Sequence, residues 1–315
     1  MNSGINVVAI LGGLGSQMFK YAFFVDLKRK SPKKTYIDLS PFEYSKMWNG
    51  YELSRIFGIE ELNVFPYEDN KIDFFKGYAI NTLNSLSLLN KTVYFNRGLS
   101  YRYYYEHDLL SRIYNKVNRK IWQFKFNKRE FDSYPENYFD TEGNVYFDEF
   151  DHKSDLYFAD SKDTILKIFQ FPPLKGDKNV NIAEKMLLEN TVALHVRRTD
   201  HLYDNGNLQN NSFYFKSVEA IKKNCDSPSF FVFSDDIVWC KKNINKIGLG
   251  NRDIIYFIDW NKLENSYIDM QLMTFCHHNI VPFSSFSWWG AYLSSRKKKM
   301  SFAPNGTWMN IEFHF

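Results

Sequence analysis

The chain has 315 residues, 44% of them hydrophobic, which is enough for a packed core and for two domains of ordinary size. Its 40 basic residues outnumber its 36 acidic residues by only four, which argues against nucleic acid as a partner. No apolar run approaches the roughly 20 residues of a membrane span, and the first residues do not resemble a signal peptide, so we expect a cytoplasmic protein. Three widely spaced cysteines fit reduced thiols better than a disulfide framework or a zinc site: Cys225, Cys240 and Cys276.

The N-terminal segments predict a strand, a glycine-rich turn, a helix and a second strand. Residues 6–11 are a short β-rich run, residues 17–30 carry apolar residues at helical spacing, and residues 34–38 form the second strand. Between about residues 60 and 150, aromatic residues crowd the sequence without a clear period, so we assign no elements there.

Strands and helices alternate again after Thr191, which predicts a parallel sheet with helices on both faces. The expected order is strand 191–196, helix 212–224, strand 229–233, a helix after Asp236, strand 253–258, helix 264–276 and strand 278–281. The proline- and glycine-containing segment 171–181 is the best candidate for an interdomain linker. We therefore expect an α/β protein with domains 1–172 and 173–315 that face each other across a central cleft.

The glycine-rich turn is the first candidate binding loop. Gly12, Gly13 and Gly15 allow a ligand to approach the backbone closely, and Ser16 and Gln17 lie where a helix start would offer free N–H groups to a phosphate. A tight turn without a ligand is the competing interpretation.

A dinucleotide site is a further alternative for this turn. The residues from Gly13 to Gly15 resemble the start of the G-x-G-x-x-G motif, and Asp38 ends the next strand at a suitable distance. However, Met18 occupies the third glycine position, where a side chain would obstruct close packing of helix on strand, so we do not favour a nicotinamide-dependent oxidoreductase.

Two further candidate loops follow apolar strands. Adjacent Arg197 and Arg198 suit a diphosphate, because a guanidinium group can bind it in a bidentate manner; one arginine would face the ligand and the other a structural carboxylate such as Asp200. A surface ion-pair cluster is the alternative. The second of these loops contains Ser234, Asp235 and Asp236, which could contact a nucleoside, hold a metal or cap a helix. We rank nucleoside contact above metal, because no third acid lies in a suitable register.

A fourth loop contains serines at an expected helix start, where hydroxyl and N–H groups could bind phosphate or simply cap the helix. The tryptophans that follow, Trp288 and Trp289, fit packing better than ligand stacking. The candidate residues of this loop are Ser284, Ser285, Phe286 and Ser287.

Taken in order, these segments resemble bacterial α-1,2-fucosyltransferases of glycosyltransferase family 11. The matching stretches, which span residues 12 to about 294, are GGLGSQMFKYAF, FDEFDHKSDLYFADSKDTILKIFQF, LHVRRTDHL, FVFSDDIVWCK and DMQLMTFCHHNIVPFSSFSWWGAYLS. The resemblance implies a GT-B fold of two Rossmann-like domains, with an acceptor-side domain that carries the glycine turn and an aromatic, basic insertion, followed by a GDP-fucose-binding domain. It also implies inverting transfer of L-fucose from GDP-β-L-fucose to a hydroxyl such as O2 of a terminal galactose, with no obligatory metal or other cofactor.

By the same resemblance, Arg197 matches the arginine that holds the β-phosphate, and Asp200 is the matched acid for the role of general base. His195 and the Ser234–Asp236 turn match groups near guanine and ribose, the Ser284–Ser287 turn matches a phosphate contact, and the glycine turn lies near the donor's diphosphate and sugar. The acceptor would be a galactose-terminated or lipid-linked glycan.

Several residues depart from the family pattern and leave alternatives open: Ser16, Thr199, His201 and Phe283. A fucosyltransferase of α-1,6 or α-1,3 linkage is one alternative, and a catalytically silent GDP-sugar- or glycan-binding protein is another. The segment 97–129 carries nine basic and two acidic residues among aromatic and aliphatic ones, so it is either a solvated basic face or a peripheral contact with an anionic membrane.

Overall fold

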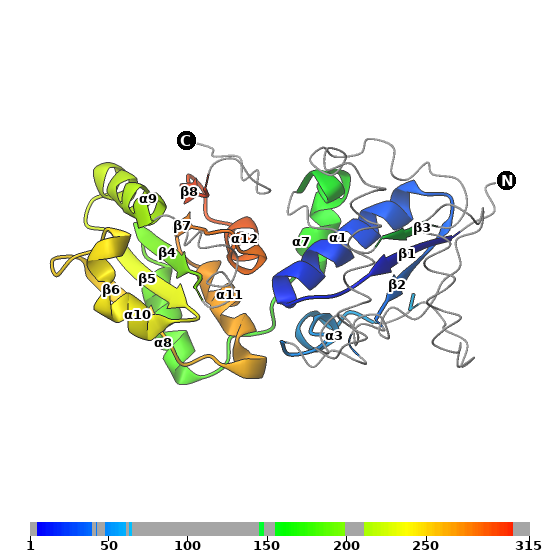
Figure 1. Ribbon diagram of the computed structural model, residues 1–315, viewed down its shortest axis with the longest axis horizontal. Helices are drawn as coiled ribbons and strands as arrows, with labels where there is room; N and C mark the ends of the chain where they lie inside the picture. The colour runs from blue at the N-terminus through cyan, green and yellow to red at the C-terminus, as the bar shows by residue number, and fades with distance from the viewer. Residues whose placement is uncertain are drawn as a thin grey trace, which may run out of the picture. The chain divides into compact units, whose positions relative to one another are not determined.

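The computed structural model describes residues 5–39, 42, 48–60, 63–64, 145–147, 155–198 and 211–304. These residues form two compact units: those up to Ile165 belong to the first, and those from Leu166 onward to the second (Figure 1). Asp200 and the basic segment 97–129 lie outside the described residues, so their predicted roles stay predictions. No helix of the described ranges is long and apolar enough to span a bilayer.

The first unit contains a three-stranded parallel sheet with the order β2-β1-β3, formed by β1 (Ile5–Ala9), β2 (Lys34–Asp38) and β3 (Val145–Phe147). Helix α1 (Leu14–Lys30) connects β1 to β2, which confirms the predicted strand–helix–strand unit. Further helical segments of this unit are α3 (Leu53–Phe57) and the 3-10 segment η1 (Asp155–Ser161), while α7 (Lys162–Ile168) crosses the boundary between the units.

Helix α1 packs in the core of the first unit. The Phe23 ring lies 5.1 Å from the ring of Phe147 on β3 and 6.1 Å from that of Tyr157 on η1. Buried Asp26 accepts a hydrogen bond from the Ser161 hydroxyl at 2.7 Å and pairs with Lys30 at 2.7 Å, so the polar side of the helix is also tied to η1.

The second unit contains a five-stranded parallel sheet with the order β6-β5-β4-β7-β8. Its strands are β4 (Thr191–Val196), β5 (Ser229–Ser234), β6 (Ile254–Ile258), β7 (His278–Ile280) and β8 (Ser301–Phe302). Strands β5 and β6 are added in chain order on one side of β4, and β7 is then added on the other side of β4. The direction of strand addition therefore reverses between β4 and β7, as in a Rossmann half.

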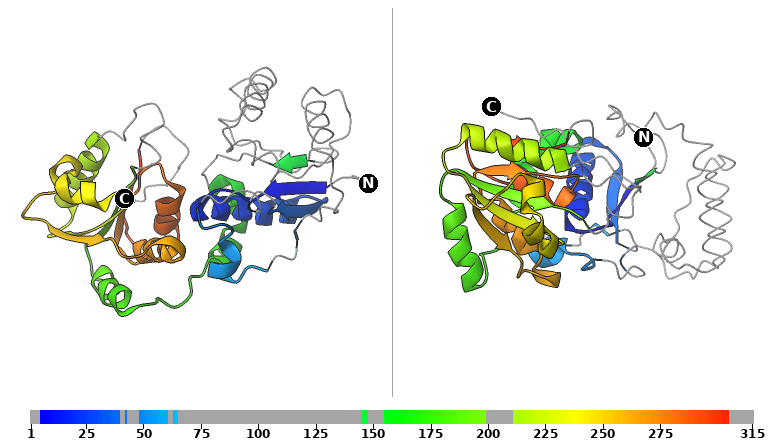
Figure 2. Two further views of the ribbon diagram at one scale, coloured as in Figure 1. Left: turned by 60° about the horizontal axis from the view of Figure 1, so that its bottom comes forward. Right: turned by 60° about the vertical axis from the view of Figure 1, so that its left-hand side comes forward.

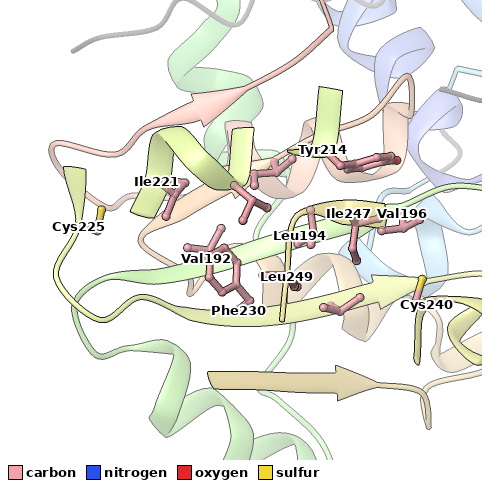
Figure 3. Close-up of a cluster of buried hydrophobic side chains, with 13 residues drawn as sticks. Val192, Leu194, Val196, Tyr214, Ile221, Cys225, Phe230, Cys240, Ile247 and Leu249 are labelled. Carbon is pink, nitrogen blue, oxygen red and sulfur yellow. The ribbon is translucent and has the colours of Figure 1, made fainter. Parts of the chain in front are cut away.

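Helices cover both faces of this sheet (Figure 2). Helix α9 packs on one face against alternate residues of β4 and β5 (Figure 3). On the other face, Lys185 of α8 lies over the ring of Tyr256 of β6. The helical segments are α8 (Asp177–Met186), α9 (Asn211–Asn224), α10 (Ile237–Lys242), η2 (Ile244–Ile247), η3 (Leu263–Asn265), α11 (Tyr267–Met273) and α12 (Ser285–Tyr292). These two parallel sheets with connecting helices confirm the predicted α/β class.

Two details differ from the sequence-based expectations. The second half of the expected linker is helical, because α8 begins at Asp177, directly after Gly176 in the left-handed region (φ +85°). The first half of that linker is anchored, since the Phe171 ring stacks on Tyr267 of the second unit. The helix expected at 264–276 is shorter, because a 3-10 turn precedes α11 and the helix ends at Met273.

Candidate functional site

Three of the four predicted loops meet at one edge of the second unit's sheet. Strands β5 and β7 flank β4, and all three run parallel, so their carboxyl ends lie next to one another. Arg197 follows β4, Asp235 follows β5, and Ser284 lies between β7 and α12. In open parallel sheets, ligands bind outside the strand ends where the order reverses, and here that point is between β4 and β7.

The turn after β5 is held by hydrogen bonds within the fold. The Ser234 hydroxyl donates to the Val196 carbonyl at 2.6 Å and accepts from the Asp236 N–H at 3.0 Å. The Asp236 carboxylate accepts from the Trp239 N–H at 3.0 Å, which makes Asp236 the N-cap of α10. The capping interpretation of this turn is therefore confirmed for Asp236, while the nucleoside contact stays a prediction.

The two arginines after β4 have different surroundings. The Arg198 side chain donates through Nε to Asp236 at 3.2 Å, and its guanidinium lies 3.8 Å from the centre of the Trp239 ring. Its backbone N–H donates to Asp235 at 2.9 Å. Arg198 thus pairs with the carboxylate of Asp236, the residue that caps α10, while a contact with Asp200 stays a prediction because Asp200 lies outside the described residues.

Arg197 is the more accessible of the pair. Its side chain is 28% exposed, against 14% for Arg198, and its Nε lies 3.5 Å from a carboxylate oxygen of Asp235. The backbone N–H of Arg197 donates a hydrogen bond to the hydroxyl oxygen of buried Tyr214 on α9. Burial raises the pKa of Tyr214, so this hydroxyl remains neutral and holds the loop. The sequence did not single out Tyr214, because its helical spacing marks it only as a core residue.

A buried hydrogen bond joins the two sides of the strand reversal. Nδ1 of His195 on β4 lies 2.8 Å from the Ser287 hydroxyl in the first turn of α12, and both side chains are buried. The His195 ring lies 6.2 Å from the ring of Phe286. These residues therefore fix the distance between the end of β4 and the start of α12.

Helix α12 begins at Ser285, with Ser284 as the N-cap residue in extended conformation. A helix start presents backbone N–H groups that suit an anion. Trp288 and Trp289 are fully buried, with ring centres 5.0 Å apart, so the packing interpretation of the two tryptophans is confirmed.

The glycine turn belongs to the first unit. Gly13 is the N-cap residue of α1, and Gly15 lies in the first turn of the helix. Gly12 has φ +89°, and a Cβ there would lie 2.9 Å from the Cβ of Ser16, so the turn requires glycine at this position. The Gln17 amide donates to two backbone carbonyls, those of Gly12 and Gly50, at 2.8 Å each. Both amide hydrogens of Gln17 are therefore used within the fold. The backbone N–H groups of Ser16 and Gln17 donate to the Gly13 carbonyl at 2.9 and 3.0 Å, so they are not the free N–H groups that the sequence suggested. Contact of this turn with the donor stays a prediction.

Among the residues that the structure describes, no group of three or more His, Cys, Asp or Glu side chains is arranged to hold a metal ion. The three cysteines are buried free thiols, and burial raises the pKa of Cys276 and Cys240.

The chain is similar to known glycosyltransferases. A family model described as glycosyl transferase family 11 matches residues 8–315. An alpha-1,2-colitosyltransferase of Escherichia coli is 29% identical over 315 residues, which cover 95% of this chain and 91% of that protein. The bovine galactoside 2-alpha-L-fucosyltransferase SEC1 is 30% identical over 108 residues, 33% of this chain and 28% of that protein. The solved structure of NodZ alpha-1,6-fucosyltransferase soaked with GDP-fucose is 13% identical, with a TM-score of 0.46 over 92% of each chain.

Proposed function

The chain belongs to glycosyltransferase family 11, and we propose that it transfers L-fucose from GDP-β-L-fucose to O2 of a terminal galactose on a glycan. The observation that carries this proposal is the position of Arg197 at the strand reversal, directly after β4, the strand next to the one that leads into α12. A guanidinium group and a helix start are two groups suited to a diphosphate. Membership of the family makes a sugar nucleotide the natural source of that diphosphate.

In this proposal the reaction is a direct displacement at the anomeric carbon. The acceptor oxygen forms a bond to C1 of fucose, the bond from C1 to the phosphate oxygen breaks, and GDP leaves with the electron pair. The β-linked donor thereby becomes an α-fucoside. The proton of the acceptor hydroxyl passes to a general base, for which Asp200 remains the proposed residue.

The cationic groups would act on the leaving group. Negative charge develops on the β-phosphate as the bond breaks, and Arg197 with the first-turn N–H groups of α12 would stabilise it in place of a metal ion. Arg198 would contribute indirectly, because its contacts with Asp236 and Trp239 fix the loop from which Arg197 extends.

A second donor is favoured by one observation. The relative that matches 95% of this chain is named for colitose, a sugar that lacks the 3-hydroxyl group of fucose. The same diphosphate site would serve GDP-colitose, and the two donors would be distinguished by whether a polar group meets the 3-hydroxyl. Because unpaired buried polar groups are costly, a site that binds this hydroxyl would discriminate strongly against colitose.

The proposal is tested by GDP release from GDP-fucose and from GDP-colitose, each with and without a panel of β-galactosides and each repeated in EDTA. We expect release that is stimulated by acceptor and resistant to EDTA, with an α-1,2 product by NMR. An α-1,6 or α-1,3 product would overturn the linkage, preference for GDP-colitose would overturn the fucose assignment, and loss of release in EDTA would overturn the metal-free mechanism. GDP binding without release in any arm would indicate a silent binding protein.

A further inference from the structure

An exposed tryptophan beside the glycine turn has no role in the function proposed so far. Trp48 is 49% exposed, and its backbone lies in the left-handed region with φ +56°. This conformation is unfavourable for a bulky L-residue, and such outliers concentrate at binding and catalytic sites. Deep burial does not account for it, because about half of the residue's surface faces solvent.

The segment around Trp48 is held rigidly on its C-terminal side. Gln17 of α1 is fully buried, donates to the Gly50 carbonyl at 2.8 Å and accepts from the Glu52 N–H at 2.9 Å. The Glu52 carboxylate in turn accepts from the Asn49 side chain at 3.2 Å and from Arg55 at 2.7 Å. The turn that carries Trp48 is therefore fixed to the first turn of α1 by buried side chains.

The same turn places the indole against the glycine segment. A Cβ at Gly13 would lie 3.4 Å from Cδ1 of Trp48, which is van der Waals contact. Gly13 directly precedes α1, just after the carboxyl end of β1, and ligands of parallel sheets bind outside such strand ends. One part of the indole thus packs on the turn, while the remainder is presented at the edge of the first unit's sheet.

We propose that Trp48 binds the acceptor glycan by stacking against the apolar face of its terminal sugar ring. An indole presents an electron-rich face, and a pyranose presents C–H groups with partial positive charge on one face. The rigid turn adds to affinity, because little side-chain entropy is lost when the sugar binds. This inference rests on the proposed function, since it takes the acceptor to be a glycan.

The kinetic test compares Trp48→Ala and Trp48→Phe with wild type. We expect Trp48→Ala to raise the KM for a β-galactoside acceptor by about tenfold, with partial recovery in Trp48→Phe, because phenylalanine keeps an aromatic face. The KM for GDP-fucose and the slow hydrolysis of GDP-fucose without acceptor should not change. Leu263→Ala is the matched control, because Leu263 is also exposed and left-handed (78%, φ +53°) but lies in the second unit, and it should behave as wild type.

An unchanged acceptor KM in Trp48→Ala would overturn the proposal. A rise in the KM for GDP-fucose alone would overturn it in favour of guanine as the stacking partner. Melting temperatures of the variants close to that of wild type would exclude unfolding as the cause.

A binding measurement keeps this inference separate from the proposed function. The chain has seven tryptophans, and Trp48→Phe identifies the indole N–H resonance of Trp48 in a ¹⁵N NMR spectrum. Titration with lactose should shift this resonance more than the other six, whether or not the protein transfers fucose. If transfer occurs and the resonance does not shift, the inference fails and the function stands; if the resonance shifts without any transfer, the function fails and the inference stands.

Discussion

Alanine at position 198 should destabilise the second unit, whereas alanine at position 197 should reduce turnover and leave stability nearly unchanged. The two arginines are neighbours in the sequence and carry the same charge. In the structure they differ in the contacts that their side chains make. Comparing the two alanine variants therefore distinguishes a residue that fixes the loop from a residue that binds the ligand.

The magnitudes follow from the contacts. Arg198→Ala removes the 3.2 Å contact with Asp236 and the 3.8 Å stack on Trp239, worth about 1 kcal/mol each at a partly buried site. For a unit of this size, a loss of about 2 kcal/mol lowers the melting temperature by about 4–8 °C. The ion pair that Arg197→Ala removes, at 3.5 Å from Asp235, is worth about 0.5 kcal/mol or less. The kcat of Arg197→Ala should fall by about 10²–10³-fold, as when one preorganised charge-stabilising group is removed.

The assay measures melting temperature and acceptor-stimulated GDP release on the same preparations. Arg252→Ala is the control, because Arg252 is an exposed arginine of the same unit at the turn before β6, and both quantities should stay at the wild-type values. The reasoning is refuted if Arg197→Ala keeps near-normal kcat, or if it lowers the melting temperature as much as Arg198→Ala does.

Two further predictions concern the helices behind the site. Gly290→Ala should lower stability by about 1–3 kcal/mol in urea unfolding, because its Cβ would lie 2.8 Å from the Cβ of Met273 and force α12 away from α11; an unchanged unfolding midpoint would contradict this packing. Burial raises the pKa of Asp269 to about 7, so the folded state binds the extra proton, and this group lowers stability as pH rises from about 4 to 7. The free energy of unfolding of Asp269→Asn should therefore rise relative to that of wild type as the pH increases across that interval. A difference in unfolding free energy that does not change with pH would refute the pKa shift.

The local elements could be predicted from the sequence because their signals are local. Alternating apolar residues and helical spacing identified β1, α1 and β2, and the same signals identified the run from β4 to β7. Each candidate loop was found because polar residues such as Arg197 or Ser284 directly follow an apolar strand. The capping alternative for Asp236 was also available, since the cap and its N–H partner lie only three residues apart.

The roles within the site depend on contacts between distant residues, which no local pattern reveals. Arg198 and Asp236 are 38 residues apart, and His195 and Ser287 are 92 residues apart. Which carboxylate each arginine pairs with, Asp235 for Arg197 and Asp236 for Arg198, follows only from the pairing of β4 with β5. The Gln17 amide donates to the backbone of a turn 33 residues away, a contact that its position at a helix start does not reveal.

A crystal structure of the protein with GDP would test the central claim most directly. The account predicts that the β-phosphate lies within hydrogen-bond distance of the Arg197 guanidinium and of the first-turn N–H groups of α12, at the reversal between β4 and β7. A diphosphate bound only at the glycine turn between β1 and α1 would contradict the account, because it would place the nucleotide in the first unit and leave Arg197 without a role in the reaction.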